Sequence, residues 1–312
     1  MTTGLRSCVR RSAVDLSCYR NGVVGKVRVK HLNDGHGNRV PDSFTLIELL
    51  VVIAIIAILA ALLLPSLNHS KQEAQGKLCM SNARQLIIAW TMYASDFKDV
   101  LPYNLPSLEA GGWVNGNMGF GNDPTNIPLM LSGQIGPYAQ SGGIYKCPAD
   151  LSMALVYNLT NFKSFLMPRC RSVSMNFAVG DNSPTGSRLA IVPWPHIFKM
   201  TEFKMASKTW VLSDEDASTI NDGYQSPFWV DFPSYIHWCD LPASYHNGAA
   251  GYAFADGHAE VHRFLDWPWP VLNPPQSPYY LDDPNGTDIH WVESRCAPDP
   301  NSIYPWLNPG VN

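Results

Sequence analysis

The sequence predicts an α+β protein in which one long N-terminal helix packs on a small antiparallel β-sheet of a loop-rich head. Three patterns indicate this: a continuous apolar run near the N-terminus, an apolar stripe at helical spacing after it, and short apolar segments separated by Gly, Pro and Asn further on. Of the 312 residues, 46% are hydrophobic and 15% charged, a composition that excludes intrinsic disorder. The formal net charge of −4 offers no basic surface to a nucleic acid, so no nucleic-acid partner is expected.

The N-terminal region differs in charge from the rest of the chain. A basic leader, residues 1–43, carries eight Lys or Arg against three Asp, whereas the remainder holds 14 basic and 23 acidic residues. Residues 44–64 follow as an apolar run in which Glu48 is the single ionisable residue. A helix of this length rises about 32 Å, which matches the hydrocarbon core of a bilayer and exceeds the apolar region of a secretory signal. We expect a transmembrane helix with its basic flank in the cytoplasm and the head outside it.

The transmembrane helix is expected to continue into a helical spine over residues 65–99. Apolar residues recur there at intervals of three or four, which is typical of a helix with one buried face. These residues are Cys79, Ala83, Leu86, Trp90, Tyr93 and Phe97. One helix from about Thr45 to about Phe97 accounts for both segments, with Pro65 bending it and Pro102 following its end.

Beyond the spine, residues 100–266 are expected to form the head domain. Its apolar runs are short and are separated by turn-forming residues, which is typical of a loop-rich fold. Thr209–Ser213 is the clearest strand, because β-branched and aromatic residues dominate it. The tail, residues 267–312, is rich in proline and has no clear pattern.

A β-hairpin is expected near the end of the head. Residues 251–255 and 258–264 flank the dipeptide Asp256-Gly257. Such a turn requires positive φ angles, which Gly accepts freely and Asp tolerates. The pattern therefore gives Asp256 and Gly257 a structural role.

The residues at the start of the apolar run indicate a family. The segment from Ser43 to Ile56, SFTLIELLVVIAII, resembles the processing motif of type IV pilins and type II secretion pseudopilins. The resemblance implies that a prepilin peptidase cuts between Ser43 and Phe44 and that the new amine is methylated. It also implies that Glu48 pairs with the N-terminal amine of a neighbouring subunit during filament assembly, and that Pro65 kinks the helix as in pilins.

A second resemblance lies near the end of the head. His246 is followed by nine residues and then by Asp256-Gly257. This spacing resembles the H-x9-DG element found with prepilin-type N-termini in planctomycete and verrucomicrobial proteins. Four further matches also resemble that group: the segments 79–82, 146–150 and 174–176, and Tyr93 with Asp96.

Four polar residues of the head are candidates for a divalent metal site: Asp214, His246, Asp256 and His258. Carboxylate oxygens suit calcium and imidazole nitrogens suit zinc, so calcium or another divalent ion is the one cofactor considered. Major pseudopilins, which the chain resembles, bind calcium through a carboxylate-lined loop. The alternative is structural: Asp256 forms the turn, His246 bonds a backbone carbonyl, and His258 lies on the surface of a strand.

Five cysteines follow the leader, and their odd number leaves at least one thiol free or paired between chains. They are Cys79, Cys147, Cys170, Cys239 and Cys296. Disulfides are permitted outside the cytoplasm. Cys79 and Cys147 are the first candidates, because a bond between them would tie the spine to the head. The chain has no Cys-x-x-Cys spacing, which argues against a four-thiolate zinc site.

The run Asp214-Glu215-Asp216 has two interpretations. Paired carboxylates can hydrolyse glycosides, but three adjacent acids are more typical of a solvated loop, which we expect here. The sequence has no Gly-x-Ser-x-Gly, phosphate-loop or HExxH motif. We therefore expect no enzymatic activity.

The expected function is structural. The resemblance implies a single-pass protein of the inner membrane, or of a filament at the cell surface. Its implied partners are the prepilin peptidase and other pilin or pseudopilin subunits of a type IV pilus or type II secretion filament. The alternative is a singly anchored extracytoplasmic carbohydrate-binding module or hydrolase that uses a prepilin-type leader.

Overall fold

The computed structural model describes residues 9–12, 15–17, 19–20, 23–24, 45–105, 111–119, 121–158, 162–180, 195–227, 237–265, 281–282 and 286–301. The chain divides into two compact units, Met1–Ala60 and Ala61–Asn312. The candidate cleavage residues Ser43 and Phe44 lie outside the described residues. Two antiparallel strand pairs are described in the leader: β1 (Val9–Ser12) with β2 (Asp15–Ser17), and β3 (Tyr19–Arg20) with β4 (Val23–Val24).

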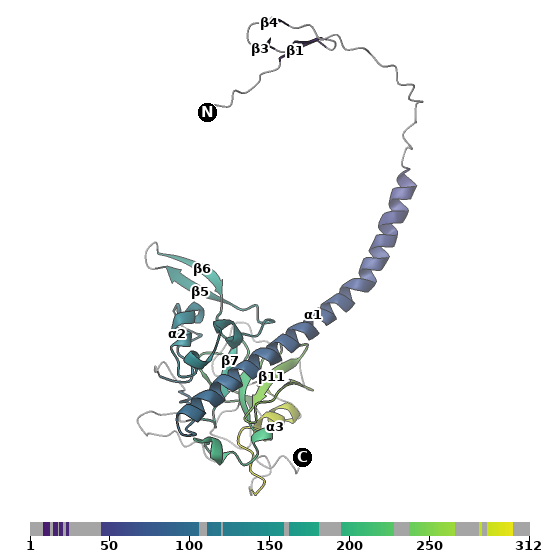
Figure 1. Ribbon diagram of the computed structural model, residues 1–312. Helices are drawn as coiled ribbons and strands as arrows, with labels where there is room; N and C mark the ends of the chain where they lie inside the picture. Colours follow the sequence, from purple (N-terminus) through teal and green to yellow (C-terminus); the bar gives the residue numbers. More distant parts are fainter. Residues whose placement is uncertain are drawn as a thin grey trace. The chain divides into compact units, whose positions relative to one another are not determined.

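The helix α1 (Leu46–Asp96) runs for 51 residues and continues through Pro65 (Figure 1). Its ends lie within one residue of the predicted limits, so the predicted joining of an apolar helix and a spine is confirmed. Among the described residues it is the one helix long and apolar enough to cross a membrane. All its large apolar side chains from Leu46 to Leu64 are exposed, a surface that a soluble protein would bury.

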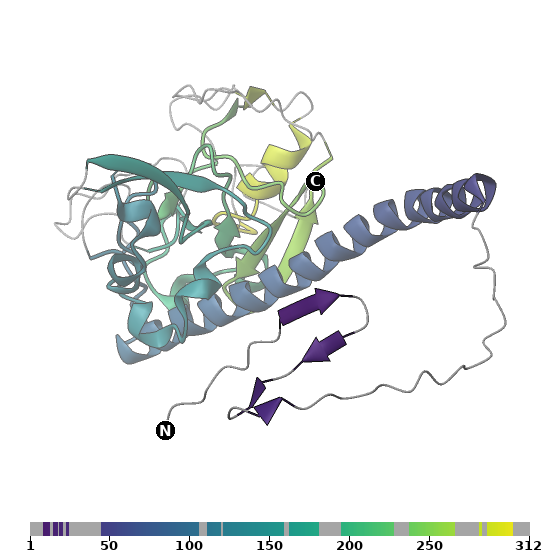
Figure 2. The same cartoon turned by 90° about the horizontal axis from the view of Figure 1, so that it is seen from above.

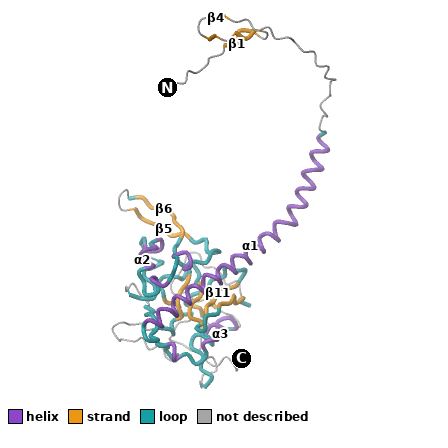
Figure 3. Tube along the Cα trace, viewed as in Figure 1, coloured by secondary structure: helices purple, strands orange, loops and turns teal. Residues whose placement is uncertain are grey.

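The head contains a five-stranded sheet in the order β12-β11-β8-β7-β9, of which β11 is labelled in Figure 3. Its strands are β7 (Val173–Asn176), β8 (Trp210–Asp214), β9 (Tyr224–Gln225), β11 (Ala249–Phe254) and β12 (Ala259–Arg263). All neighbours are antiparallel except β7 and β9. The predicted hairpin is confirmed, since Ala253 pairs with Ala259 across a turn in which Gly257 has a φ of 92°.

Two helices pack on opposite faces of this sheet, α1 on one and α3 (Thr287–Glu293) on the other (Figures 1 and 2). On β11, a Cβ atom at Gly251 would lie 3.4 Å from the Cys79 sulfur of α1. The next residue, Tyr252, packs its ring 5.1 Å from that of Trp291 on α3. Because side chains alternate along a strand, these contacts fall on the two faces. The spine therefore covers one side of the sheet.

The tail contributes two elements that the sequence pattern does not predict. One is α3, and the other is β13 (Leu281–Asp282), which pairs with β10 (His237–Trp238). With 7 residues, α3 is too short to give a clear helical period. Its buried Ile289 and Val292 are nevertheless one turn apart and face the core.

The remaining elements of the head are short. The strands β5 (Met153–Asn158) and β6 (Lys163–Pro168) form a hairpin that exposes Leu155 and Leu166. α2 (Ile127–Leu131) follows a 3-10 turn at Asp123–Thr125. Four further 3-10 turns are Gly136–Tyr138, Gly142–Tyr145, Met200–Glu202 and Ala206–Lys208.

The run Asp214-Glu215-Asp216 is not a solvated loop, and that prediction is wrong. Asp214 ends β8, and only 2% of Asp214 and 0% of Glu215 are exposed. Arg171, which is equally buried, offsets part of the negative charge of Glu215. Asp216 is half-buried and accepts hydrogen bonds from Ser218. These acids therefore form part of the interior.

The buried acids predict a loss of stability as the pH rises. Loss of hydration raises the pKa of the half-buried Asp240 to about 8, and Asp222 adds to the rise, although the Ser226 backbone N–H donates to the carboxylate at 2.7 Å. The folded chain therefore holds a proton that the unfolded chain releases. The contribution of this proton to the free energy of unfolding is fully present below about pH 4 and is lost as the pH rises through about 8.

We expect the substitution Asp240→Asn to reduce the fall in the urea midpoint of the full chain between about pH 5.5 and about pH 8.5. The exposed Glu260 offers a matched control, because Glu260→Gln also removes one carboxylate. Equal pH dependence in the wild type and in Asp240→Asn would contradict the assignment.

Candidate functional site

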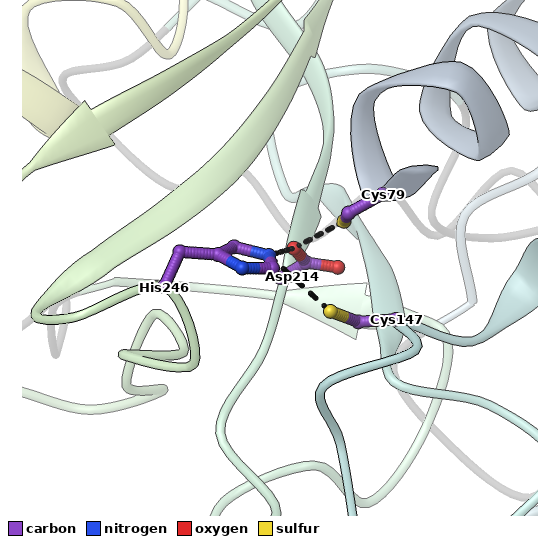
Figure 4. A group of neighbouring side chains, drawn as sticks. All are labelled: Cys79, Cys147, Asp214 and His246. Carbon is purple, nitrogen blue, oxygen red and sulfur yellow. Dashed lines mark hydrogen bonds and ion pairs between the residues drawn. The ribbon is translucent and has the colours of Figure 1, made fainter. Parts of the chain in front are cut away.

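Four side chains from distant parts of the chain meet between α1 and the sheet (Figure 4). Cys79 belongs to α1, Asp214 ends β8, Cys147 follows the 3-10 turn at Gly142–Tyr145, and His246 precedes β11. One sulfur, nitrogen or oxygen atom from each lies within 4.8 Å of all the others. Cys79, Cys147 and Asp214 are buried, and the His246 side chain is 5% exposed.

The spine holds the loop that carries Cys147. Gln75, Cys79 and Asn82 are spaced four and three residues apart, which places them on one face of α1. Gln75 donates a hydrogen bond to the carbonyl of Pro148 at 3.2 Å, and Asn82 donates to the carbonyl of Lys146 at 3.4 Å. These two bonds flank Cys147 and fix it opposite Cys79.

The sheet places the other two side chains. Asp214 Oδ2 accepts a hydrogen bond from the backbone N–H of Gly251 at 3.3 Å. A Cβ atom at Gly251 would lie 2.8 Å from that oxygen, so the site requires glycine there. His246 enters through a tight turn in which Asn247 and Gly248 have φ angles of 59° and 79°. Asn-Gly is a favoured pair for two consecutive positive φ angles.

The four groups contact one another directly. The Cys79 thiol donates to Asp214 Oδ2 at 2.9 Å, and Cys147 Sγ lies 3.3 Å from His246 Nε2. The same nitrogen lies 3.8 Å from Asp214 Oδ2. His246 is the one ion-pair partner of Asp214 in the described part of the chain. The buried carboxylate thus has no Lys or Arg beside it there.

These contacts shift the pKa values of all four groups. The polar contact with Cys79, together with His246, lowers the pKa of Cys147 to about 5, whereas the pKa of Cys79 itself is raised. Burial raises the pKa of Asp214 to about 7. Burial opposes protonation of His246, but the hydrogen bond to Cys147 and the negative charges of Cys147 and Asp214 together outweigh it and raise the pKa of the imidazole. Of the two thiols, Cys147 is therefore the one that ionises more readily.

Only two of the four predicted metal-ligand candidates belong to this cluster. Asp214 and His246 meet there, whereas Asp256 and His258 pair with each other at the turn between β11 and β12, with Oδ1 and Nδ1 2.5 Å apart. The His258 ring stacks on Phe254 at 4.3 Å. Asp256 thus forms the turn, and His246 contacts a thiol rather than a backbone carbonyl.

Cys79 and Cys147, the predicted disulfide partners, lie close to each other. Both are free thiols in the structure, with sulfur atoms within 4.8 Å of each other. The disulfide stays a prediction. Their role beside Asp214 and His246 was missed, because the four residues are far apart in the sequence and follow no ligand spacing. One signal could have grouped three of them: Cys79, Cys147 and His246 lie in segments 79–82 and 146–150 and at the start of the H-x9-DG pattern, all of which carry the resemblance to one group of proteins.

The geometry is not that of a Cys-His-Asp catalytic triad. In a triad the carboxylate binds the ring nitrogen that faces away from the nucleophile. Here Cys147 and Asp214 both face His246 Nε2, and Nδ1 has no hydrogen-bond partner among the described residues. Donor atoms that converge on one centre are the arrangement of metal ligands.

An apolar N-terminal helix that continues as the spine of an α+β head is the architecture of a singly anchored, pilin-like membrane protein. Comparison with known proteins agrees. The chain is 37% identical over 72 residues to the competence protein ComGC of Halalkalibacterium halodurans, an alignment that covers 23% of this chain and 70% of ComGC. The chain belongs to the ComGC family of pilin-like proteins. No family model matches it, and no solved structure is significantly similar to it.

Proposed function

We propose that this chain is a filament subunit of the type IV pilus or type II secretion kind. A prepilin peptidase removes residues 1–43, the amine of Phe44 is methylated, and the apolar helices then bundle into the filament core. The apolar surface of α1 from Leu46 to Leu64 carries this proposal, because it needs either lipid or neighbouring helices to cover it. The basic flank supports an orientation with the N-terminus in the cytoplasm and the head outside it.

Assembly rather than catalysis is the proposed role of the head. The thiols of the site are buried, and among the described residues no carboxylate binds the imidazole nitrogen that faces away from Cys147. The spine instead joins the head to the membrane helix in one continuous helix. A subunit built in this way carries its head to the filament surface.

The mature N-terminus tests the processing step. Mass spectrometry of the chain isolated from its native membrane is expected to find an N-terminal peptide that begins at a methylated Phe44. An intact leader on the membrane-bound chain would contradict the proposal.

Glu48 has a local structural role that the assembly test must separate from pairing with an amine. Its Oε2 accepts hydrogen bonds from the backbone N–H and the hydroxyl of Thr45, at 2.8 and 2.7 Å. The Thr45 hydroxyl in turn accepts from the backbone N–H of Glu48 at 3.3 Å. This reciprocal pair is a capping box, which stabilises the first turn of α1. Glutamine can form the same cap without a charge.

We therefore expect Glu48→Gln and Glu48→Ala to abolish filaments alike, because neither side chain can neutralise the amine of a neighbouring subunit in the membrane. Both variants should still reach the membrane. The measurement is electron microscopy of sheared filaments, with immunoblotting of the membrane fraction. Normal filaments from Glu48→Gln together with none from Glu48→Ala would show that Glu48 acts only as a helix cap.

A further inference from the structure

We propose that Cys79, Cys147, Asp214 and His246 bind one zinc ion that fastens the spine helix to the head. The proposal does not depend on filament assembly, since it concerns the fold of the head alone. It uses the four side chains drawn in Figure 4, which come from α1, the loop before β5, the end of β8 and the turn before β11.

The distances fit a tetrahedral ion. Zinc bonds of about 2.0 to 2.3 Å to N, O and S donors place those donors about 3.3 to 3.8 Å apart. Three contacts of the cluster measure 2.9, 3.3 and 3.8 Å, and all pairs lie within 4.8 Å. Donor shifts of about 1 Å or less are therefore enough to close the site.

The donor set selects zinc rather than calcium. Calcium takes six to eight oxygen ligands, whereas this cluster offers two sulfurs, one nitrogen and one carboxylate. Two thiolates and an imidazole are typical ligands of structural zinc, which is fully coordinated by four protein side chains. The predicted calcium ligands Asp256 and His258 play no part in it.

A disulfide between Cys79 and Cys147 would not explain why Asp214 and His246 lie beside these two thiols. It would consume the two sulfurs but provide no cation for Asp214, which is 2% exposed and has only His246 as an ion-pair partner among the described residues. Buried charges are normally paired or bound to a metal. A zinc ion supplies the positive charge and also uses the imidazole.

The place of the cluster gives the ion a structural role. Its ligands join four segments that are each at least 32 residues apart in sequence, from Cys79 to His246. Because a metal site of this kind forms only in the folded chain, the free energy of zinc binding adds to that of folding. The ion would thus hold the spine against β8 and β11 when the head is pulled through its membrane helix.

The test uses the full chain in detergent, purified without chelators or reductant from cells supplied with zinc. Elemental analysis is expected to find about one zinc ion per chain, and chelation should lower the melting temperature. Replacement by Co²⁺ should give absorption bands from thiolate-to-cobalt charge transfer. Cys147→Ser and His246→Gln should lose the ion, while Cys170→Ser and His258→Gln, which change the same residue types elsewhere in the head, should keep it.

Near-UV circular dichroism shows whether each variant folds. If a ligand variant does not fold, the metal content and the cobalt spectrum of the wild type still test the proposal. Zinc retained in folded His246→Gln and Cys147→Ser variants would overturn the proposal. So would a wild-type chain that holds no stoichiometric metal, or one in which peptide mapping finds Cys79 and Cys147 joined in a disulfide. Cobalt bands without thiolate charge transfer would also exclude this site.

Discussion

Arg171→Ala is expected to lower the free energy of unfolding by about 3–5 kcal/mol, because it leaves several buried hydrogen-bond acceptors without their donor, at about 1–3 kcal/mol each. Arg171 is 0% exposed, and its guanidinium donates to the carbonyls of Val173 and Asp222 at 2.7 and 2.6 Å. Glu215, also 0% exposed, is attracted by the same positive charge. Alanine removes these bonds together with the positive charge near Glu215, and burial already raises the pKa of that acid.

Urea unfolding of the full chain with chelator present measures this effect without a contribution from bound metal. Arg169 supplies the matched control, since it is half-buried and donates one hydrogen bond, to the carbonyl of Ala217 at 2.8 Å. Arg169→Ala is expected to cost about 1 kcal/mol. The double variant Arg171→Met/Glu215→Gln should recover part of the loss, because neither position then carries a charge. Similar losses from Arg171→Ala and Arg169→Ala would contradict the assigned role.

Regular patterns made most of the fold predictable. The stripe from Cys79 to Phe97 has the period of a helix, and the Asp256-Gly257 turn has neighbours that alternate as strands do, so α1 and the β11–β12 hairpin follow from local sequence. Short elements carry too few residues to show a period. This explains why α3 was not predicted, although its Trp291 packs against Tyr252 in the core.

The site was less predictable, because it depends on contacts between distant segments. Asp214 and Glu215 look like part of a solvated acidic run, yet neighbouring side chains of a strand point to opposite sides. Asp214 accepts a hydrogen bond from Cys79 of α1, whereas Glu215 lies near Arg171. Sequence also placed His246 and His258 in one site, although β11 separates them. Only the pairing of the strands shows which of them meets the two thiols.

The attachment of the spine to the head makes Trp90→Ala the second substitution with a large expected effect, about 3–5 kcal/mol of unfolding free energy. Trp90 is 0% exposed, and its ring packs edge-on against Phe203 with centroids 6.1 Å apart. Alanine would remove that contact and leave a cavity. The neighbouring Ile87 is already fully buried in its own place, so its side chain is not available to fill the cavity.

Met92 lies only two residues further along the same helix and is 50% exposed, so Met92→Ala changes the apolar character of α1 without opening the core. We expect it to shift the urea midpoint far less than Trp90→Ala does. Helical content by far-UV circular dichroism should stay close to that of the wild type in both, because alanine is the strongest helix former. A loss confined to Trp90→Ala therefore measures packing of the spine on the head. If both substitutions had the same effect, the stability of the head would not depend on the buried face of the spine.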